Sequence, residues 1–308
     1  MNEIRISIII VSYKVKDLLL ACLDSIERIS GIDGVEIIVV DNNSDDGSME
    51  AVKVRFPAVK CIENKFNAGF SGGNNQGMRV ARGKFIFLLN PDTELESNAL
   101  GFLESYLINN PSCALVAPKL INKDGSLQVS AWKDYKISGL VLETFFLDKI
   151  FSPLNYPVEF FSREFSPEAL SGAALFFRKS LIDSIGLLDE QLFWMEDMDF
   201  CHRASKTGSL VYLPSALVIH HNGQSQKKNY RVAISNQLLS KLKYFGKTQS
   251  LVIRAFANTI CFLFICSRIL AFSLASFFGN VYRQKAGAYI YSFQKLIRYL
   301  FLNDKTVV

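Results

Sequence analysis

The chain has 308 residues, of which 49% are apolar, and its formal net charge is +5. This length allows one large domain with an appendage. The six cysteines form no CxxC pair and no zinc-like spacing with the three histidines, so we expect free thiols in a reducing cytoplasm. Residues 1–5 lead straight into an apolar segment, and we therefore expect no signal peptide.

The charge is divided unevenly along the chain. Residues 226–308 hold 13 Lys or Arg and a single acid, whereas residues 1–225 hold 21 basic and 28 acidic residues. An acidic body and a basic tail indicate that the two parts meet different partners.

Short apolar runs alternate with helical periodicity in the first 90 residues. We predict buried strands at residues 4–11, 35–40, 59–62 and 85–89, with helices at 17–29 and up to Arg82 between them. Such alternation predicts a parallel α/β sheet with right-handed crossovers. Further on, we predict a helix at 97–109 and strands at 113–118, 172–178, 210–214 and 216–219.

Polar residues follow each of the first four predicted strands. They are Tyr13, Asp41, the segment 67–75 and Asp92. Because the carboxyl ends of parallel strands share one edge, where ligands of open α/β sheets bind, these residues can converge on one site. Asp92 is a hard oxygen ligand suited to Mg²⁺ or Mn²⁺. The simpler alternative is that Asn90-Pro91-Asp92 only forms a turn.

Two nucleotide-binding classes are disfavoured. The glycine-rich segment at 69–77 fits neither GxGxxG directly after the first strand nor GxxxxGK[ST]. A dinucleotide dehydrogenase and a P-loop enzyme are therefore poor fits.

Acids and large apolar residues are interleaved between Asp189 and Asp199. Acids held against apolar surface lose water, which raises a carboxyl pKa toward the range of a general base. Trp194 in this segment is either an apolar wall for an acceptor or a core residue. Residues 131–167 are rich in aromatic residues that follow no clean period. This segment either contacts an acceptor or lipid carrier or is an ordinary packed loop, and we favour the packed loop.

Four motifs in order resemble the inverting glycosyltransferases of family 2, most closely the bacterial rhamnosyltransferase branch. They are residues 8–13, 39–48, 67–77 and 89–93, and the resemblance covers about residues 4–225. It implies a GT-A fold, an α/β architecture with a mixed, mainly parallel sheet. Residues 1–118 would form the nucleotide-sugar-binding half and 119–225 the acceptor-binding half, followed by a helical tail at 226–308.

The resemblance also implies roles for particular residues. Tyr13 would stack on the pyrimidine of the donor and Asp41 would hydrogen-bond its edge. Asp92 would hold the metal together with one of the tandem histidines, for which His220 is favoured, since successive strand residues face opposite ways. Asn90 replaces the first Asp of a DxD motif, which leaves one fewer charge at the metal. The full set of expected donor contacts is Val11, Tyr13, Asp41, Asn67, Gly69, Asn75 and Asn90.

The same resemblance places catalysis in the acidic segment. Asp197 would be the general base, with Glu196 or Asp199 supporting it, and Trp194 and Asp199 would contact the acceptor. The implied reaction is inverting transfer from a nucleotide-diphosphate sugar, with dTDP-rhamnose preferred over UDP-galactofuranose and UDP-hexoses. The acceptor would be a glycan or lipid-linked glycan of bacterial surface polysaccharide such as O-antigen.

Two other classes stay open. A sugar-phosphate nucleotidyltransferase can use a similar sheet and metal, but residues 12–16 lack the glycine such enzymes usually carry after the first strand. A non-catalytic membrane-bound adaptor could keep the fold without the chemistry. We predict no nucleic-acid partner in either case.

The tail is apolar and basic. Residues 231–245 have helical amphipathicity, and residues 251–282 are apolar apart from Arg254 and Arg268, which leave pieces of 13 and 14 residues. These are shorter than the roughly 18–20 residues that span a bilayer. We favour an in-plane or re-entrant helical pair on the cytoplasmic face of the cell membrane. A soluble dimerisation hairpin, giving a homodimer, and a true span are the alternatives.

Overall fold

The computed structural model describes residues 3–29, 33–151, 155–221 and 230–301. The chain divides into two compact units. The sheet unit comprises Met1–Asp134, Tyr156–Glu190 and Glu196–Ser225, and the helical unit comprises Tyr135–Asn155, Gln191–Met195 and Gln226–Val308. Two segments that we expected in the first domain, Tyr135–Asn155 and Gln191–Met195, thus group with the C-terminal helices.

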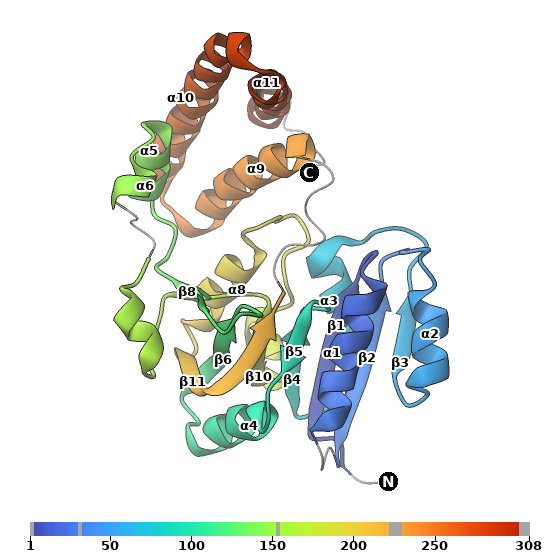
Figure 1. The fold of residues 1–308 in the computed structure, drawn as a ribbon. Coiled ribbons are helices and arrows are strands. Elements are labelled where there is room, and N and C mark those ends of the chain that lie inside the picture. Colours follow the sequence, from blue (N-terminus) through green and yellow to red (C-terminus); the bar gives the residue numbers. More distant parts are fainter. Residues whose placement is uncertain (1–2, 30–32, 152–154, 222–229, 302–308) are drawn as a thin grey trace. The chain divides into compact units, whose positions relative to one another are not determined.

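The first half of the sheet unit confirms the predicted alternation of strands and helices (Figure 1). Strands β1, β2, β3 and β4 all run parallel, in the order β3-β2-β1-β4. Every residue of β4 is buried, as expected of a strand inside a parallel sheet. The bounds are β1 Ile6–Ser12, α1 Lys16–Arg28, β2 Val35–Asp41, α2 Ser48–Arg55, β3 Lys60–Glu63, α3 Gly69–Val80 and β4 Phe85–Leu89.

The second half makes the sheet mixed but still mostly parallel. Strand β10 (Ala174–Arg178) lies antiparallel between β4 and β6 (Cys113–Ile121). Strand β11 (Ser209–His220) runs parallel to β6 and antiparallel to the short edge strand β5 (Thr93–Leu95). This mixed sheet is the architecture that the family resemblance implied.

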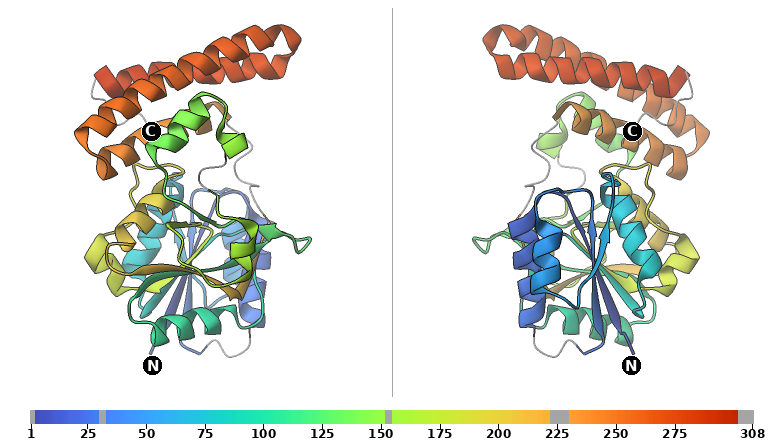
Figure 2. Two further views of the ribbon diagram at one scale, coloured as in Figure 1. Left: turned by 90° about the vertical axis from the view of Figure 1, so that its left-hand side faces the viewer. Right: turned by 90° about the vertical axis from the view of Figure 1, so that its right-hand side faces the viewer.

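Helices cover both faces of the sheet (Figure 2). On one face, apolar residues of α1, α2 and α4 (Ala99–Asn109) pack on alternate strand residues such as Ile8 and Phe87. On the other face, α3, α7 (Ser180–Ile185) and α8 (Glu196–Ala204) pack on Ile9 and Leu88. Because strand side chains alternate between faces, each apolar strand contributes to both cores.

One expectation about the last strands is wrong. Residues 210–214 and 216–219 do not form two strands, because β11 runs through both with a shift of register between Leu213 and Leu217. Pro214 explains the shift, since it lacks the N–H that a regular ladder requires. The bulge interrupts pairing without ending the strand.

The aromatic residues of 131–167 differ in burial, since some pack in the core and others are exposed. The 3₁₀ turn Val158–Ser162 and the residues after it pack Phe161 and Phe165 edge-on against each other and close to Tyr212 of β11. This part follows the packing interpretation. Residues 145–151, by contrast, keep their large apolar side chains exposed.

The helical unit consists of α5 (Ile137–Thr144), α6 (Asp148–Phe151), α9 (Tyr230–Thr248), α10 (Leu251–Ala275) and α11 (Asn280–Phe301). Lys241 on α9 forms a 2.6 Å ion pair with Glu143 on α5. The backbone N–H of Phe193 donates a 2.7 Å hydrogen bond to Oγ of Ser240 on α9. These bonds explain why the two inserted segments belong to this unit.

Helix α10 is longer than the tail pattern suggested. It continues unbroken through Arg254 and Arg268. Among the described residues, one helical stretch, Leu251–Phe278, is long and apolar enough to cross a membrane, and only 22% of its most apolar window is buried in the protein. Arg268 itself is buried, because its guanidinium donates to the carbonyl of Glu143 and lies over the ring of Phe146. Arg268 thus forms its contacts with the end of α5, and α10 continues through it as a regular helix.

Candidate active site

The carboxyl edge of the sheet brings the predicted polar residues together. Ser12, at the end of β1, pairs with Asp41, at the end of β2. Beside them, the N–H of Asn90 after β4 donates to the carbonyl of Ala173, one residue before β10. Because β10 is antiparallel, its beginning lies at the same edge as the ends of β1, β2 and β4. The site is therefore built from segments before and after residue 118.

Asp41 is buried and fixed by the loop that follows it. Its carboxylate accepts hydrogen bonds from the backbone N–H and the hydroxyl of Ser44. The loop requires left-handed backbone at Asn43, Asp45 and Gly47, conformations that Asn, Asp and Gly tolerate best. The motif after β2 thus serves the shape of the loop as well as any ligand.

Tyr13 follows β1 and is half-buried, with the ammonium group of Lys14 5.4 Å from its ring centre. The N–H of Lys14 donates to Oγ of Ser44, which ties the Tyr13 loop to the Asp41 loop. These two predicted donor-binding residues therefore lie on connected loops at one edge.

The segment before α3 also lies at this edge. Asn67 is exposed and accepts a 2.8 Å hydrogen bond from the N–H of Gly69, whose φ is +73°. A Cβ on Gly69 would meet no atom within 4 Å. Gly69 is thus needed for its backbone angle and faces open space.

Two other expected donor contacts are largely occupied by the protein. Asn75 is buried, and its amide bonds the backbone N–H and C=O of Leu188 and the carboxylate of Glu190. The side chain of Val11 packs closely against Gly73 of α3, since a Cβ on that glycine would lie only 2.7 Å from it. Both residues hold α3 in place beneath the site.

Asp92 and His220 form the most defined polar pair of the site. His220 Nε2 lies 3.2 Å from Asp92 Oδ1, and both side chains are buried. On the other side of the ring, Nδ1 lies 3.0 Å from Oε1 of Gln128 on β7 (Leu127–Gln128). An amide oxygen only accepts, so Nδ1 carries the proton and Nε2 is directed at the carboxylate. His221 faces the other way and meets Glu94 at 2.8 Å.

This pair fits a divalent cation. A carboxylate oxygen and an imidazole nitrogen held by a second hydrogen bond are ligands that Mn²⁺ accepts. Among the described residues, no group of three or more His, Cys, Asp or Glu side chains could hold a metal. Asp92 and His220 would therefore supply two ligands, and a bound ligand and water the rest.

Asp197 lies in the first turn of α8 and is bound by two backbone N–H groups. Gly172 donates to Oδ2 at 3.0 Å, and Met198 donates to Oδ1 at 2.8 Å. Burial raises the pKa of Asp197 above the ordinary value of 3.8, although both hydrogen bonds oppose the shift. A carboxylate with a raised pKa at a ligand-binding edge is suited to accept a proton.

The other members of the acidic segment are placed differently. Asp199 is 1% exposed and forms a 2.8 Å ion pair with Arg203, which donates in turn to backbone carbonyls at the end of α7. Asp199 is thus engaged in holding α8 to the segment after α7, and its contact with an acceptor stays a prediction. Glu196 begins α8 and is half-buried. Trp194 belongs to the helical unit, is 42% exposed and has a φ of +77°, which is costly for a bulky residue.

Three contributors were not singled out from the sequence. They are Ser44, which holds Asp41, Gln128, which orients His220, and Gly172, which donates to Asp197. Gly172 carried one signal, because a small residue before a buried strand allows close approach. A Cβ there would lie 3.3 Å from Cβ of Asp197.

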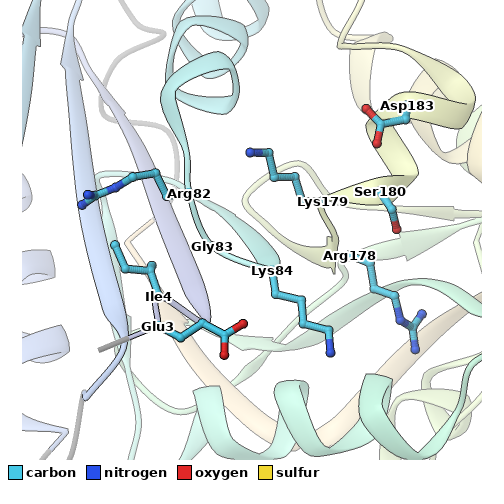
Figure 3. Close-up of a pocket in the computed structure, with 9 residues that line it drawn as sticks. All are labelled: Glu3, Ile4, Arg82, Gly83, Lys84, Arg178, Lys179, Ser180 and Asp183. Carbon is cyan, nitrogen blue, oxygen red and sulfur yellow. The ribbon is translucent and has the colours of Figure 1, made fainter. Parts of the chain in front are cut away.

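A cavity of about 670 Å³ lies at the opposite edge of the sheet (Figure 3). It is lined by residues before β1 and β4 and by the end of the antiparallel β10. Three of its bases serve the fold: Arg178 donates to the carbonyls of Asn110 and Cys113, Lys179 to that of Ala81, and Arg82 to the carboxylate of Glu36. The candidate active site is therefore the carboxyl edge and not this cavity.

Comparisons with known proteins identify the family of the chain. The model of the family described as "Glycosyl transferase family 2" matches residues 7–186. The N-acetylglucosaminyl-diphospho-decaprenol L-rhamnosyltransferase of Mycobacterium tuberculosis is 28% identical over 208 residues, covering 62% of this chain and 68% of the relative. The low-salt glycan biosynthesis hexosyltransferase Agl10 of Haloferax volcanii is 26% identical over 259 residues, covering 79% and 77%.

Among solved structures, a mannosyltransferase from Pyrobaculum calidifontis in complex with GDP-Man and Mn²⁺ superposes with a TM-score of 0.59 at 15% identity. The match covers 99% of this chain and 90% of that one, and it bears on the fold alone. Because the family model spans more than half of the chain, the protein belongs to glycosyl transferase family 2 and has the GT-A fold.

Proposed function

We propose that the protein is an inverting, metal-dependent glycosyltransferase that uses Asp197 as its general base. The observation that carries this proposal is the placement of Asp197 at the start of β10. Its carboxylate accepts a hydrogen bond from the N–H of Gly172, and the next residue, Ala173, accepts one from the N–H of Asn90. Asp92 and His220 lie at the same edge of the sheet. A base and a metal-binding pair on one edge are what direct sugar displacement requires.

In this mechanism Asp197 accepts the proton of the acceptor hydroxyl as its oxygen attacks the anomeric carbon from the face opposite the leaving group. The two N–H groups on Asp197 fix the direction of the carboxylate, and burial keeps its proton affinity high. Asp41 and Tyr13 hold the base of the nucleotide. A divalent cation on Asp92 and His220 would neutralise charge developing on the diphosphate.

For the donor we propose dTDP-rhamnose, with UDP-sugars as the alternative. The support is the rhamnosyltransferase relative at 28% identity and the motifs shared with that branch. The acceptor proposed is a lipid-linked glycan of bacterial surface polysaccharide, because the same relative is named for a decaprenol-linked substrate. Trp194 remains a predicted acceptor contact.

We also propose that residues 226–308 bind the protein to the cytoplasmic face of the membrane with α10 in the plane of the bilayer. One face of α10, including Ala257, Ile265 and Arg268, is buried within the helical unit. That unit also contains the Lys241–Glu143 ion pair. If α10 spanned the bilayer, it would either carry these charged groups into the hydrocarbon or separate from the helices that pack on it. In-plane binding keeps the unit intact.

The experiment that tests the function is a donor screen with purified protein. Release of nucleotide from dTDP-rhamnose, UDP-galactose, UDP-GlcNAc and GDP-mannose is measured with Mn²⁺, Mg²⁺ or EDTA, beside Asp197→Asn. The matched control is Asp183→Asn, an exposed acid on α7. We expect metal-dependent release from one donor and a loss of about 10²- to 10⁴-fold in Asp197→Asn. Release that survives in this variant would remove Asp197 as the base.

The same screen separates the other classes. A nucleotidyltransferase would instead form nucleotide sugar from a sugar phosphate and a nucleoside triphosphate. An adaptor would bind nucleotide without turnover, even when lipid extracts are supplied as acceptors.

A further inference from the structure

The segment between α5 and the end of α6 exposes a cluster of large apolar side chains that no part of the site uses. We call these residues the apolar tip. Ile150 is 72% exposed, Phe151 64% and Phe145 60%, and the complete set is Phe145, Phe146, Leu147, Ile150 and Phe151. Five such residues lie within seven positions, and a cluster of this kind marks an interaction surface more often than a scatter of single residues does.

The apolar tip is fixed to α10 by a buried arginine. The guanidinium of Arg268 donates to the carbonyl of Glu143, at the end of α5, and its centre lies 3.2 Å from the ring centre of Phe146. Asp148, the acid of α6, is close enough to interact with the same charge. Figure 1 shows α5 beside α10. The tip and α10 therefore present their apolar residues as parts of one body.

The outer face of α10 carries a second apolar surface, which we call the exposed stripe. Its members recur at helical spacing along α10 and are Val252, Phe256, Leu263, Leu270 and Leu274. The buried residues Ala257, Cys261, Ile265 and Arg268 recur between them on the opposite face. From Val252 to Leu274 this stripe extends over about 33 Å of the helix.

The charge around these surfaces selects the partner. Arg254, Arg283 and Arg298 are exposed on α10 and α11, and residues 226–308 carry 13 basic residues against one acid. Glu143, the acid of α5, is paired with Lys241. A large apolar surface on a helical unit with a strongly basic tail fits an anionic bilayer, where apolar side chains enter the acyl boundary and bases meet head groups.

We propose that the apolar tip is a second membrane anchor, which inserts beside the exposed stripe of α10 into an anionic bilayer. The proposal rests on the membrane association proposed above and adds an anchor that ends 75 residues before the tail begins at residue 226. Two anchors on one body would fix the orientation of the helical unit on the membrane, which a single in-plane helix leaves free to roll about its axis.

The test is flotation of the full chain with vesicles of phosphatidylcholine alone or with 30% phosphatidylglycerol. The tip variant carries Phe145→Ser, Ile150→Ser and Phe151→Ser. The matched control carries Val54→Ser, Phe102→Ser and Ile108→Ser, exposed apolar residues of the sheet unit. We expect the parent and the control to bind anionic vesicles. The partition coefficient of the tip variant should be lower by a factor of about ten or greater.

The outcomes are distinct. Equal binding of the parent and the tip variant would overturn the tip anchor alone, whereas a parent that binds neither vesicle would overturn it together with the membrane association. Conversion of a dimeric parent into a monomeric tip variant, with unchanged flotation, would show that a second copy covers the tip. Nucleotide release from a soluble donor tests the transferase activity independently of all three.

A second readout covers the case in which the tip variant folds poorly. Phe151→Trp is placed in a background with Trp132→Phe and Trp194→Phe, and its fluorescence is measured with brominated lipids. We expect quenching on anionic vesicles that exceeds that of Val54→Trp in the same background. Equal quenching at the two positions would contradict insertion of the tip.

Discussion

The backbone N–H of Gly172 donates a 3.0 Å hydrogen bond to Oδ2 of Asp197. One residue later, the carbonyl of Ala173 accepts from the N–H of Asn90, two residues before Asp92. The beginning of β10 is therefore the physical link between the proposed base and the proposed metal-binding segment. The position of each group depends on a short stretch of small residues between them.

Gly172→Ala should impair turnover without unfolding the sheet unit. A Cβ at this position would lie 3.2 Å from the ring of Phe70 and 3.3 Å from Cβ of Asp197, so Asp197 would have to move. A displaced base costs about 10- to 100-fold in kcat. The matched control is Gly287→Ala on α11, where a Cβ meets no atom within 4 Å. Unchanged kcat in a folded Gly172→Ala protein would contradict the positioning role.

The pH dependence of donor turnover should report Asp197. Burial raises its pKa above the ordinary 3.8, and the base must be ionised to accept a proton. The value of kcat/KM should therefore fall as the pH drops through this raised pKa, and the acid limb should lie above the ordinary carboxyl range. Asp197→Asn should remove that limb from the residual activity. A limb at the ordinary carboxyl pKa would show that another group is titrating.

The same shift has a consequence for stability. Folding favours the protonated form of Asp197, so its contribution to the free energy of unfolding is present below the ordinary pKa and is lost as the pH rises through the raised one. Asp197→Asn should flatten that part of the stability profile. This can be measured by denaturant unfolding between pH 3 and pH 8.

Metal affinity should depend on His220 and, through it, on Gln128. His220→Ala removes one of the two proposed ligands, and Gln128→Leu removes the acceptor that orients its ring. Loss of such an orienting partner weakens metal binding about 10- to 100-fold. His221→Ala is the control, because this histidine faces Glu94. Mn²⁺ binding is measured by calorimetry with nucleoside diphosphate present, and equal weakening by His220→Ala and His221→Ala would contradict the assignment.

Much of this site follows from local sequence, and the remainder depends on distant contacts. The strands and the residues that end them, such as Asp41 and Asp92, are marked by apolar runs that stop at polar residues. Gln128 meets His220 across 92 residues, and no local pattern announces such a pairing. The same applies to the apolar tip, since it is held to α10 by Arg268, which lies more than 100 residues further along the chain.

Gly73 and Gly77 of α3 should prove to be packing residues that do not contact the nucleotide. A Cβ on Gly73 would lie 2.7 Å from Val11, and one on Gly77 would overlap the side chain of Ile9 in β1. Alanine normally stabilises a helix interior relative to glycine by about 1 kcal/mol. Here, overpacking against a buried strand should outweigh that gain and destabilise the protein by about 1–3 kcal/mol.

Gly77→Ala should therefore lower the free energy of unfolding, whereas Gly287→Ala, in open space on α11, should raise it slightly. Affinity for nucleoside diphosphate, measured on the folded fraction, should stay the same in Gly77→Ala, because the buried face of α3 has no access to a ligand. If Gly77→Ala were as stable as the parent and bound nucleotide more weakly, the glycines would be acting on the ligand after all. In that case, close packing of α3 on β1 would not be the reason why glycine occupies positions 73 and 77.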